Sequence, residues 1–296
     1  MRARKAGAGS GADTIPPYRS TPGPRIGRIE TSTTAPAADR PSVRHILLLI
    51  PVGVAGGLFS GALGVGGGIV MVPLLLMLLK FDQRRAVATS LAAIVLSSIS
   101  GAATYAVAGH TDVVAGLLLG AGGVAGSLIG TRMLKVLPVA VLRWGFIALL
   151  VVIAVRMFFV VPDRGSAIEL DVPLAIGLVV AGVVMGILAG MFGIGGGVLI
   201  VPLLITILGA SDLIAKGTSL LAMIPISISG SVANIRNSFV RPLDGLVIGA
   251  AALLASFGGA AIAFIMPPWL SSLLFGIFVA VTAIQLAVRA LRAKRP

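Results

Sequence analysis

Two glycine-rich stretches decide the fold of this chain: GLFSGALGVGGG at residues 57–68 and GILAGMFGIGGG at residues 186–197. Both follow the pattern Gly-x-x-x-Gly-x-x-Gly-x-Gly-Gly-Gly within otherwise apolar sequence. Glycines four residues apart give a helix a small face for close contact with another helix. Because a triple glycine disfavours helix, each stretch predicts a helix that is interrupted at its end.

The two stretches belong to a longer internal repeat. One lies over the other after a shift of 129 residues, from Gly57 to Gly186. The same shift aligns further matches: VPLL at 72–75 with 201–204, and TSL at 89–91 with 218–220. Such self-similarity marks a duplicated structural unit. We place repeat 1 at residues 43–161 and repeat 2 at residues 172–291.

The composition places both repeats in a lipid bilayer. Of the 296 residues, 57% are hydrophobic and 11% are charged, whereas soluble domains carry about 25% charged residues. The mean hydropathy of +1.07 agrees, and the 39 glycines suit close helix packing in lipid. The sequence therefore predicts an all-α polytopic membrane protein that is surrounded by the lipid bilayer.

Ten apolar segments follow one another along the chain. They cover residues 45–63, 68–80, 86–108, 113–133, 138–161, 172–192, 197–209, 213–235, 243–265 and 269–289. Most have the roughly 20 residues that a helix needs to cross about 30 Å of hydrocarbon. Segments 68–80 and 197–209 are shorter, contain Pro73 or Pro202 and follow a triple glycine, so they predict half-helices or broken helices. The sequence therefore predicts about eight to ten transmembrane helices, depending on whether these two segments span the bilayer.

The positive charges predict the orientation. If the N-terminus is cytoplasmic and all segments cross, most Lys and Arg outside the spans fall on the cytoplasmic side, and Lys216 is one of few on the outer side. Five crossings per repeat make repeat 2 inverted relative to repeat 1, a design found in transporters. Re-entrant short segments would instead give parallel repeats and place Arg84 and Arg85 outside, which the charge rule disfavours. We therefore predict a multi-pass protein of the cytoplasmic (cell) membrane with cytoplasmic N- and C-termini.

The two ends of the chain differ from the membrane region. Residues 1–42 are rich in Pro, Gly, Ser, Thr, Ala and Arg and contain no apolar run, which predicts a disordered basic tail. A cleaved secretory signal is the alternative, but its basic region would be abnormally long and further membrane segments follow it. Residues 292–296 form a short basic C-terminal tail.

Several classes of function lack the residues that they need. The absence of cysteine excludes thiolate chemistry, and two histidines disfavour a multi-histidine centre, so we expect no metal site and no cofactor. No acidic residue lies deep in a span and no phosphate-binding Gly-Lys-Ser/Thr motif exists, so we expect no catalytic residues and no enzyme. The net charge of +13 lies at the tails and segment ends, which argues against a nucleic-acid partner.

The glycine interruptions are the first candidate site. Freed N–H groups there can bind an anion, and the next helix begins at the same place with the positive end of its dipole. Unwound backbone at membrane depth is tolerated only where protein or a water-filled cavity surrounds it. A tight turn without a ligand is the alternative. The residues concerned are Gly66, Gly67, Gly68, Gly195, Gly196 and Gly197.

Polar side chains within the apolar segments are the second candidate. The pair Thr89 and Ser90 recurs in repeat 2 as Thr218 and Ser219. Their hydroxyls can donate to an oxyanion, or they can bond back to a carbonyl of their own helix. Asn234 near the end of the eighth segment adds a polar group that is costly in an apolar helix and therefore suggests a substrate contact.

At these residues the chain resembles the TauE/SafE family, also called sulfite exporter or toluene sulfonate uptake permease-like proteins. The resemblance rests on the twofold glycine run that leads into Val-Pro-Leu-Leu, on Thr-Ser-Leu in both repeats, and on GSLIGTR at 126–132. It covers about residues 45–290. Repeat 2 departs from it where Ala255 replaces the first glycine of the last element.

The resemblance implies secondary transport of small anions, often sulfur-containing oxyanions such as sulfite, or organosulfonates. We expect a permease that works by alternating access, with a small anionic substrate bound between the repeats near the bilayer midplane. Two alternatives stay open: a channel or carrier for a metal ion or neutral solute on the same scaffold, and a non-transport membrane assembly partner. A homo-oligomer also stays open.

Overall fold

The computed structural model describes residues 43–159 and 171–292. The predicted N-terminal tail at 1–42 and the end of repeat 1 at 160–161 lie outside the described residues. Residues 293–296 of the predicted C-terminal tail lie outside them as well.

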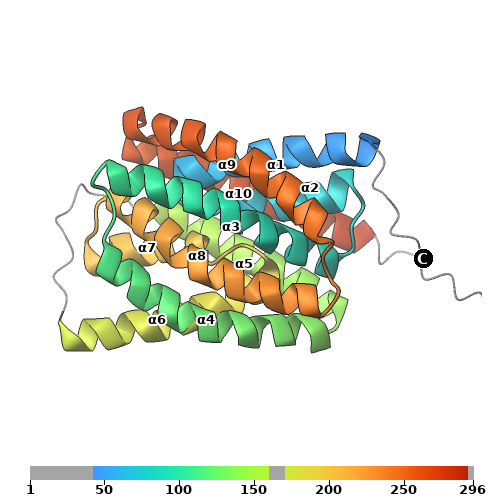
Figure 1. Cartoon of the computed structure of the whole chain (residues 1–296), viewed down its shortest axis with the longest axis horizontal. Helices are drawn as coiled ribbons and strands as arrows, with labels where there is room; N and C mark the ends of the chain where they lie inside the picture. The colour runs from blue at the N-terminus through green and yellow to red at the C-terminus, as the bar shows by residue number, and fades with distance from the viewer. Residues whose placement is uncertain (1–42, 160–170, 293–296) are drawn as a thin grey trace, which may run out of the picture. The chain divides into compact units, whose positions relative to one another are not determined.

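Ten α-helices and no strands make up the described part of the chain (Figure 1). They are α1 Val43–Leu63, α2 Gly68–Leu78, α3 Gln83–Val107, α4 Val113–Val136, α5 Val139–Phe159, α6 Val172–Phe192, α7 Gly197–Leu208, α8 Asp212–Arg236, α9 Pro242–Ile265 and α10 Pro268–Arg292. All ten predicted segments are therefore helical, and the all-α prediction is confirmed.

Side-chain caps explain why two helices start earlier than hydropathy alone indicates. The Asp82 carboxylate accepts a 2.8 Å hydrogen bond from the Arg85 amide, so α3 begins at Gln83. The Ser211 hydroxyl accepts from the Ile214 amide at 3.3 Å, and α8 begins at Asp212. Both caps satisfy first-turn N–H groups that a helix leaves without partners.

Six of the described helices are long and apolar enough to cross a membrane, namely α1, α3, α4, α6, α8 and α9. The two helices that follow the triple glycines are shorter: α2 has 11 residues and α7 has 12. At 1.5 Å per residue these lengths correspond to roughly 16–18 Å, about half of the hydrocarbon thickness. The chain is therefore a polytopic membrane protein with two short internal helices.

The helix termini gather at two ends. At the first, which we name the His45 end, the His45 ring stacks on Phe81 and binds Asp244, so the starts of α1, α3 and α9 lie together. At the second, the Lys216 end, Lys216 of α8 donates to Ser271 of α10. The hydroxyl of Tyr105, near the end of α3, donates to the Gly61 carbonyl near the end of α1.

The short helices return toward the end at which the preceding long helix began. Helix α1 starts at the His45 end, and Phe81, just beyond α2, stacks there on His45. Helix α6 ends near Val87 and Ser90 in the first turns of α3, whereas α7 leads to the start of α8 at the Lys216 end. Each glycine interruption therefore joins a long helix to a short one that runs back beside it.

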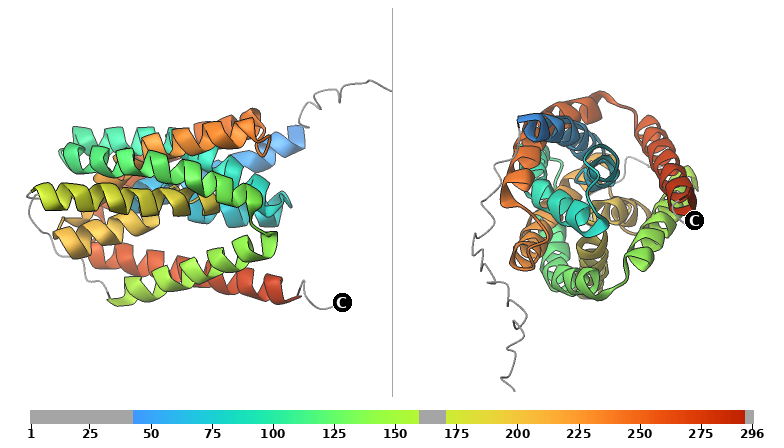
Figure 2. Two further views of the ribbon diagram at one scale, coloured as in Figure 1. Left: turned by 90° about the horizontal axis from the view of Figure 1, so that it is seen from below. Right: turned by 90° about the vertical axis from the view of Figure 1, so that its right-hand side faces the viewer.

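Small residues set the closest helix contacts. Helix α1 packs along α9, where Gly57 faces the Ala252 backbone, and α6 packs along α4, where Gly186 faces the Gly123 backbone. A Cβ at either glycine would collide with the facing main chain, as close packing of transmembrane helices predicts. Helices α5 and α10 lie side by side away from these pairs (Figure 2).

Candidate functional site

The two glycine interruptions meet inside the protein and run past each other in opposite directions. A Cβ on Gly68 would collide with the Gly193 carbonyl, and a Cβ on Gly197 would lie 2.9 Å from the Gly64 carbonyl oxygen. Residues 64–68 and 193–197 therefore form two facing strips of backbone, which we name the glycine loops. All ten residues are buried.

Only glycine fits the centre of these loops. Gly66 has a φ of 78° and Gly195 a φ of 71°, in the left-handed region that other residues rarely adopt. A Cβ on either residue would also collide with Met223 Cε. The repeated spacing of the glycines thus has a local cause, backbone conformation, and a tertiary cause, the shared contact with Met223.

The centre of the glycine loops lies midway along α3 and α8. Ile94 and Met223 are both positioned against Gly66 and Gly195. Each is the twelfth residue of its 25-residue helix. Unwound backbone therefore lies at mid-depth and is enclosed by protein, which is the setting in which it is tolerated in a membrane.

The amides of the predicted glycines have no acceptors. Within residues 43–159 and 171–292, no hydrogen bond is donated by the N–H groups of residues 66–68 or 195–197. Buried N–H groups without partners are rare in folded proteins. These six also flank the first turns of α2 and α7, where the helix dipole is positive. The arrangement can donate several hydrogen bonds to a small anion.

The predicted serines hold the glycine loops in place. Ser90 Oγ donates to the Gly193 carbonyl at 2.7 Å, and Ser219 Oγ donates to the Gly64 carbonyl at 2.6 Å. Each hydroxyl thus links one repeat to the loop of the other. The contact between repeats was not predicted from the sequence. The predicted alternative, a bond back to the same helix, is present at Ser90 as well, because its Oγ lies 3.1 Å from the Val87 carbonyl oxygen.

The predicted threonines differ from each other. The Thr218 hydroxyl accepts a 2.8 Å hydrogen bond from the Asp112 amide and so fastens α8 to the start of α4. The Thr89 hydroxyl is buried and, within the described structure, has no hydrogen-bond partner. The Thr89 hydroxyl can therefore still bind a ligand. The Thr218 hydroxyl accepts a hydrogen bond at the Lys216 end and keeps its own O–H to donate.

Asn234 is fully buried, and neither atom of its amide group has a partner among the described residues. The Ser227 and Ser231 hydroxyls on the same helix are also buried without partners. Under the 129-residue shift Asn234 corresponds to Tyr105, whose hydroxyl reaches Gly61. The shorter Asn234 side chain makes no matching contact. The Asn234 amide and the two serine hydroxyls, which lie toward the His45 end of α8, can therefore still bind a ligand.

Two buried carboxylates were not singled out by the sequence analysis. Asp212 lies 2.6 Å from the Lys216 ammonium. Asp244 binds Arg85 at 2.8 Å and His45 at 3.1 Å. The sequence predicts Lys216 among the few Lys and Arg residues of the outer side but does not predict its burial. The Lys216 side chain is 2% exposed, because it packs against Gly64 and α10. The one feature of the sequence that could have indicated the buried ion pair is a lysine one helical turn after the start of a predicted helix.

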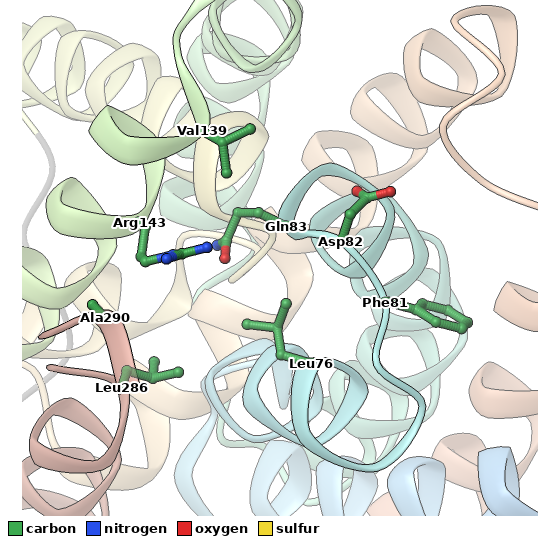
Figure 3. A pocket seen from close by; sticks show the side chains of 8 residues that line it. All are labelled: Leu76, Phe81, Asp82, Gln83, Val139, Arg143, Leu286 and Ala290. Carbon is green, nitrogen blue, oxygen red and sulfur yellow. The ribbon is translucent and has the colours of Figure 1, made fainter. Parts of the chain in front are cut away.

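Pockets open at both ends of the helices. At the His45 end a pocket of about 310 Å³ is lined by Leu76, Phe81, Asp82, Gln83, Val139, Arg143, Leu286 and Ala290. Figure 3 shows Arg143 extending toward Gln83 across this pocket. At the Lys216 end a pocket of about 270 Å³ is lined by His110, Ser211, Asp212, Leu213, Ala263, Phe264 and Met266. Among the described residues no group of three or more His, Asp or Glu could hold a metal ion.

Comparison with known proteins defines the class. The family described as Sulfite exporter TauE/SafE matches residues 18–157 and 178–296. "Probable membrane transporter protein YdhB" of Bacillus subtilis (strain 168) is 26% identical over 224 residues, which cover 75% of this chain and 91% of that protein. "Probable membrane transporter protein YunE" of the same organism is 27% identical over 240 residues, which cover 73% and 88%. No solved structure gives a significant match.

The helical fold, its apolar spans and these matches together define a multi-pass membrane transporter. The chain belongs to the TauE/SafE family, as its glycine motifs predict.

Proposed function

We propose that this transporter is a secondary permease for small anions, specifically sulfur-containing oxyanions or organosulfonates, and that the anion binds between the two glycine loops. The supporting observation is the set of six buried amides without acceptors at residues 66–68 and 195–197. An anion is the ligand that such donors and two positive helix ends favour. The family description names sulfite. Uptake measurements with this protein test which anion it transports.

The proposed mechanism is alternating access by two inverted repeats. Its support is the reciprocity of contacts: α1 packs on α9 as α6 packs on α4, and Ser90 meets Gly193 as Ser219 meets Gly64. Met223 fills the centre between the loops. Substrate binding therefore requires this flexible side chain to move, and rocking of one repeat against the other opens either end in turn.

We further propose that the protein lies in the cell membrane with its His45 end in the cytoplasm. That end carries most of the basic residues in the described connections and helix ends: Lys80, Arg84, Arg85, Arg132, Lys135, Arg143, Arg236 and Arg241. The Lys216 end carries Asp112, Asp171 and Asp212. Cytoplasmic loops with excess Lys and Arg are the rule in membrane proteins.

Purified protein in liposomes tests the function. We expect saturable uptake of radiolabelled sulfite, sulfate or methanesulfonate, with competition among them, at rates well above protein-free liposomes. Uptake of a neutral solute such as glycerol serves as the control for leakage. No uptake of any of the three anions in either direction, with or without a proton gradient, would contradict the proposal.

A further inference from the structure

The Lys216 end contains a buried ion pair that the duplicated scaffold does not require. Lys216 Nζ lies 2.6 Å from Asp212 Oδ2 and 3.0 Å from Ser271 Oγ. The corresponding residues of repeat 1, Gln83 and Val87, are uncharged. Charged side chains inside membrane segments are costly and usually functional, so a pair present in only one repeat points to a specific role.

The ion pair lies between a pocket and a glycine loop. Asp212 lines the pocket at the Lys216 end together with His110 and Phe264. One helical turn deeper, the stem of Lys216 packs on Gly64, where a Cβ would lie 2.6 Å from Lys216 Cα. The order from the pocket inward is therefore carboxylate, ammonium, glycine loop.

We infer that Lys216 is an anion-binding residue of the transport route and selects substrates by charge. The Asp212 carboxylate competes with the substrate for the Lys216 ammonium and binds it when no anion is present. The inference rests on the proposed function and names a second binding group of the same pathway. A small anion that leaves the pocket exchanges with the Asp212 carboxylate on Lys216 and then reaches the amides of residues 66–68.

The described side chains around the pair include no second lysine or arginine. Among the described side chains, Lys216 is the one buried Lys or Arg. The other ionisable groups near the pair are Tyr105, whose hydroxyl donates to Gly61, His110 in the pocket wall, and Asp112 at the start of α4. Ser271 on α10 contributes a neutral hydroxyl. Among the described groups at this end, the Lys216 ammonium is therefore the buried lysine or arginine charge that can select for anions.

Two variants in liposomes test the inference with initial rates of radiolabelled sulfate and methanesulfonate uptake. Asp212→Asn removes the competitor in an isosteric way, and we expect the half-saturating anion concentration to fall by about tenfold. Lys216→Met combined with Asp212→Asn removes both charges and leaves no unpaired buried charge, so the protein should fold. We expect its anion uptake to fall at least about tenfold. Lys135→Met, at an exposed lysine of the His45 end, is the matched control and should retain uptake.

Three outcomes separate the claims. Anion uptake by the neutral double variant at the rate of the unaltered chain would overturn the role of Lys216. An unchanged or higher half-saturating concentration in Asp212→Asn would overturn competition by the carboxylate. Absence of uptake by the unaltered chain would overturn the proposed function itself, and this inference with it.

Discussion

Ser90 donates a 2.7 Å hydrogen bond to the carbonyl oxygen of Gly193, which lies 103 residues away in the other repeat. Ser219 makes the corresponding bond to Gly64 at 2.6 Å. Both hydroxyls are fully buried. These two bonds fix the glycine loops against the central helices α3 and α8, and they keep the carbonyls occupied while the neighbouring amides stay without acceptors.

Removing either hydroxyl should destabilise the protein. Ser90→Ala or Ser219→Ala leaves a buried carbonyl without its partner, and we expect a loss of about 1–3 kcal/mol in the free energy of unfolding. Denaturation in detergent micelles measures this loss. Ser98→Ala is the control, because that hydroxyl bonds to Ile94 of its own helix at 2.6 Å. An equal loss of unfolding free energy for Ser98→Ala would show that the hydrogen bond between the repeats contributes no more to stability than a bond within one helix.

Methyl groups at the loop centre should be harmful for two separable reasons. Gly195→Ala incurs about 1–2 kcal/mol of left-handed backbone strain and a collision with Met223. Gly109→Ala, at a φ of 74° with open space around it, incurs strain alone. We expect Gly195→Ala to be the less stable variant in thermal unfolding, and Met223→Ala to recover part of the difference. Equal stability of the two glycine variants would argue against tight packing of the loops.

The Arg85–Asp244 contact should contribute to stability at the His45 end. Asp244 is 1% exposed, and Arg85→Ala removes its 2.8 Å partner while His45 remains. We expect a loss of about 1.5–3 kcal/mol, the range for hydrogen bonds to charged groups. Arg132→Ala, at an exposed arginine of the same end, should change stability by about 0.5 kcal/mol or less. Similar values for both variants in detergent unfolding would refute a role for the contact.

Cysteine labelling tests the proposed orientation. The chain contains no cysteine, so the maleimide reacts with the introduced thiol and with no native residue of the protein. Lys135→Cys places a thiol at the His45 end, and His110→Cys places one at the Lys216 end. In intact cells a membrane-impermeant maleimide should label His110→Cys only, and Lys135→Cys should react after the cells are opened. The reverse pattern would mean that the protein is oriented the other way.

The sequence predicts the positions of the helices and of the glycine loops because these depend on local properties. Apolar runs specify the ten helices, and the spacing in 57–68 and 186–197 specifies positions where only glycine fits. The internal repeat singles out Ser90 and Ser219, because the Thr-Ser-Leu sequence recurs after 129 residues. Their partners, the carbonyls of Gly193 and Gly64, could not be predicted because they depend on how the repeats interlock.

Burial of charge is the feature that the sequence predicts least well. Lys216 follows the start of a helix, where the positive-charge rule places it at a membrane surface. Its burial results from two distant contacts, Gly64 in repeat 1 and Ser271 in α10. Asp244 is buried in the same way, by Arg85 and His45. Such tertiary contacts leave no local pattern in the chain.

Locating a bound anion tests the central claim most directly. Selenate has the shape and charge of sulfate and scatters X-rays anomalously, so its position can be determined in crystals of protein that transports it in liposomes. We expect an anomalous peak between the glycine loops, within hydrogen-bond distance of amides in residues 66–68 or 195–197, with Met223 displaced. Selenate bound elsewhere along the pathway, with the loops still closed on Met223 and their amides without ligand, would contradict the account.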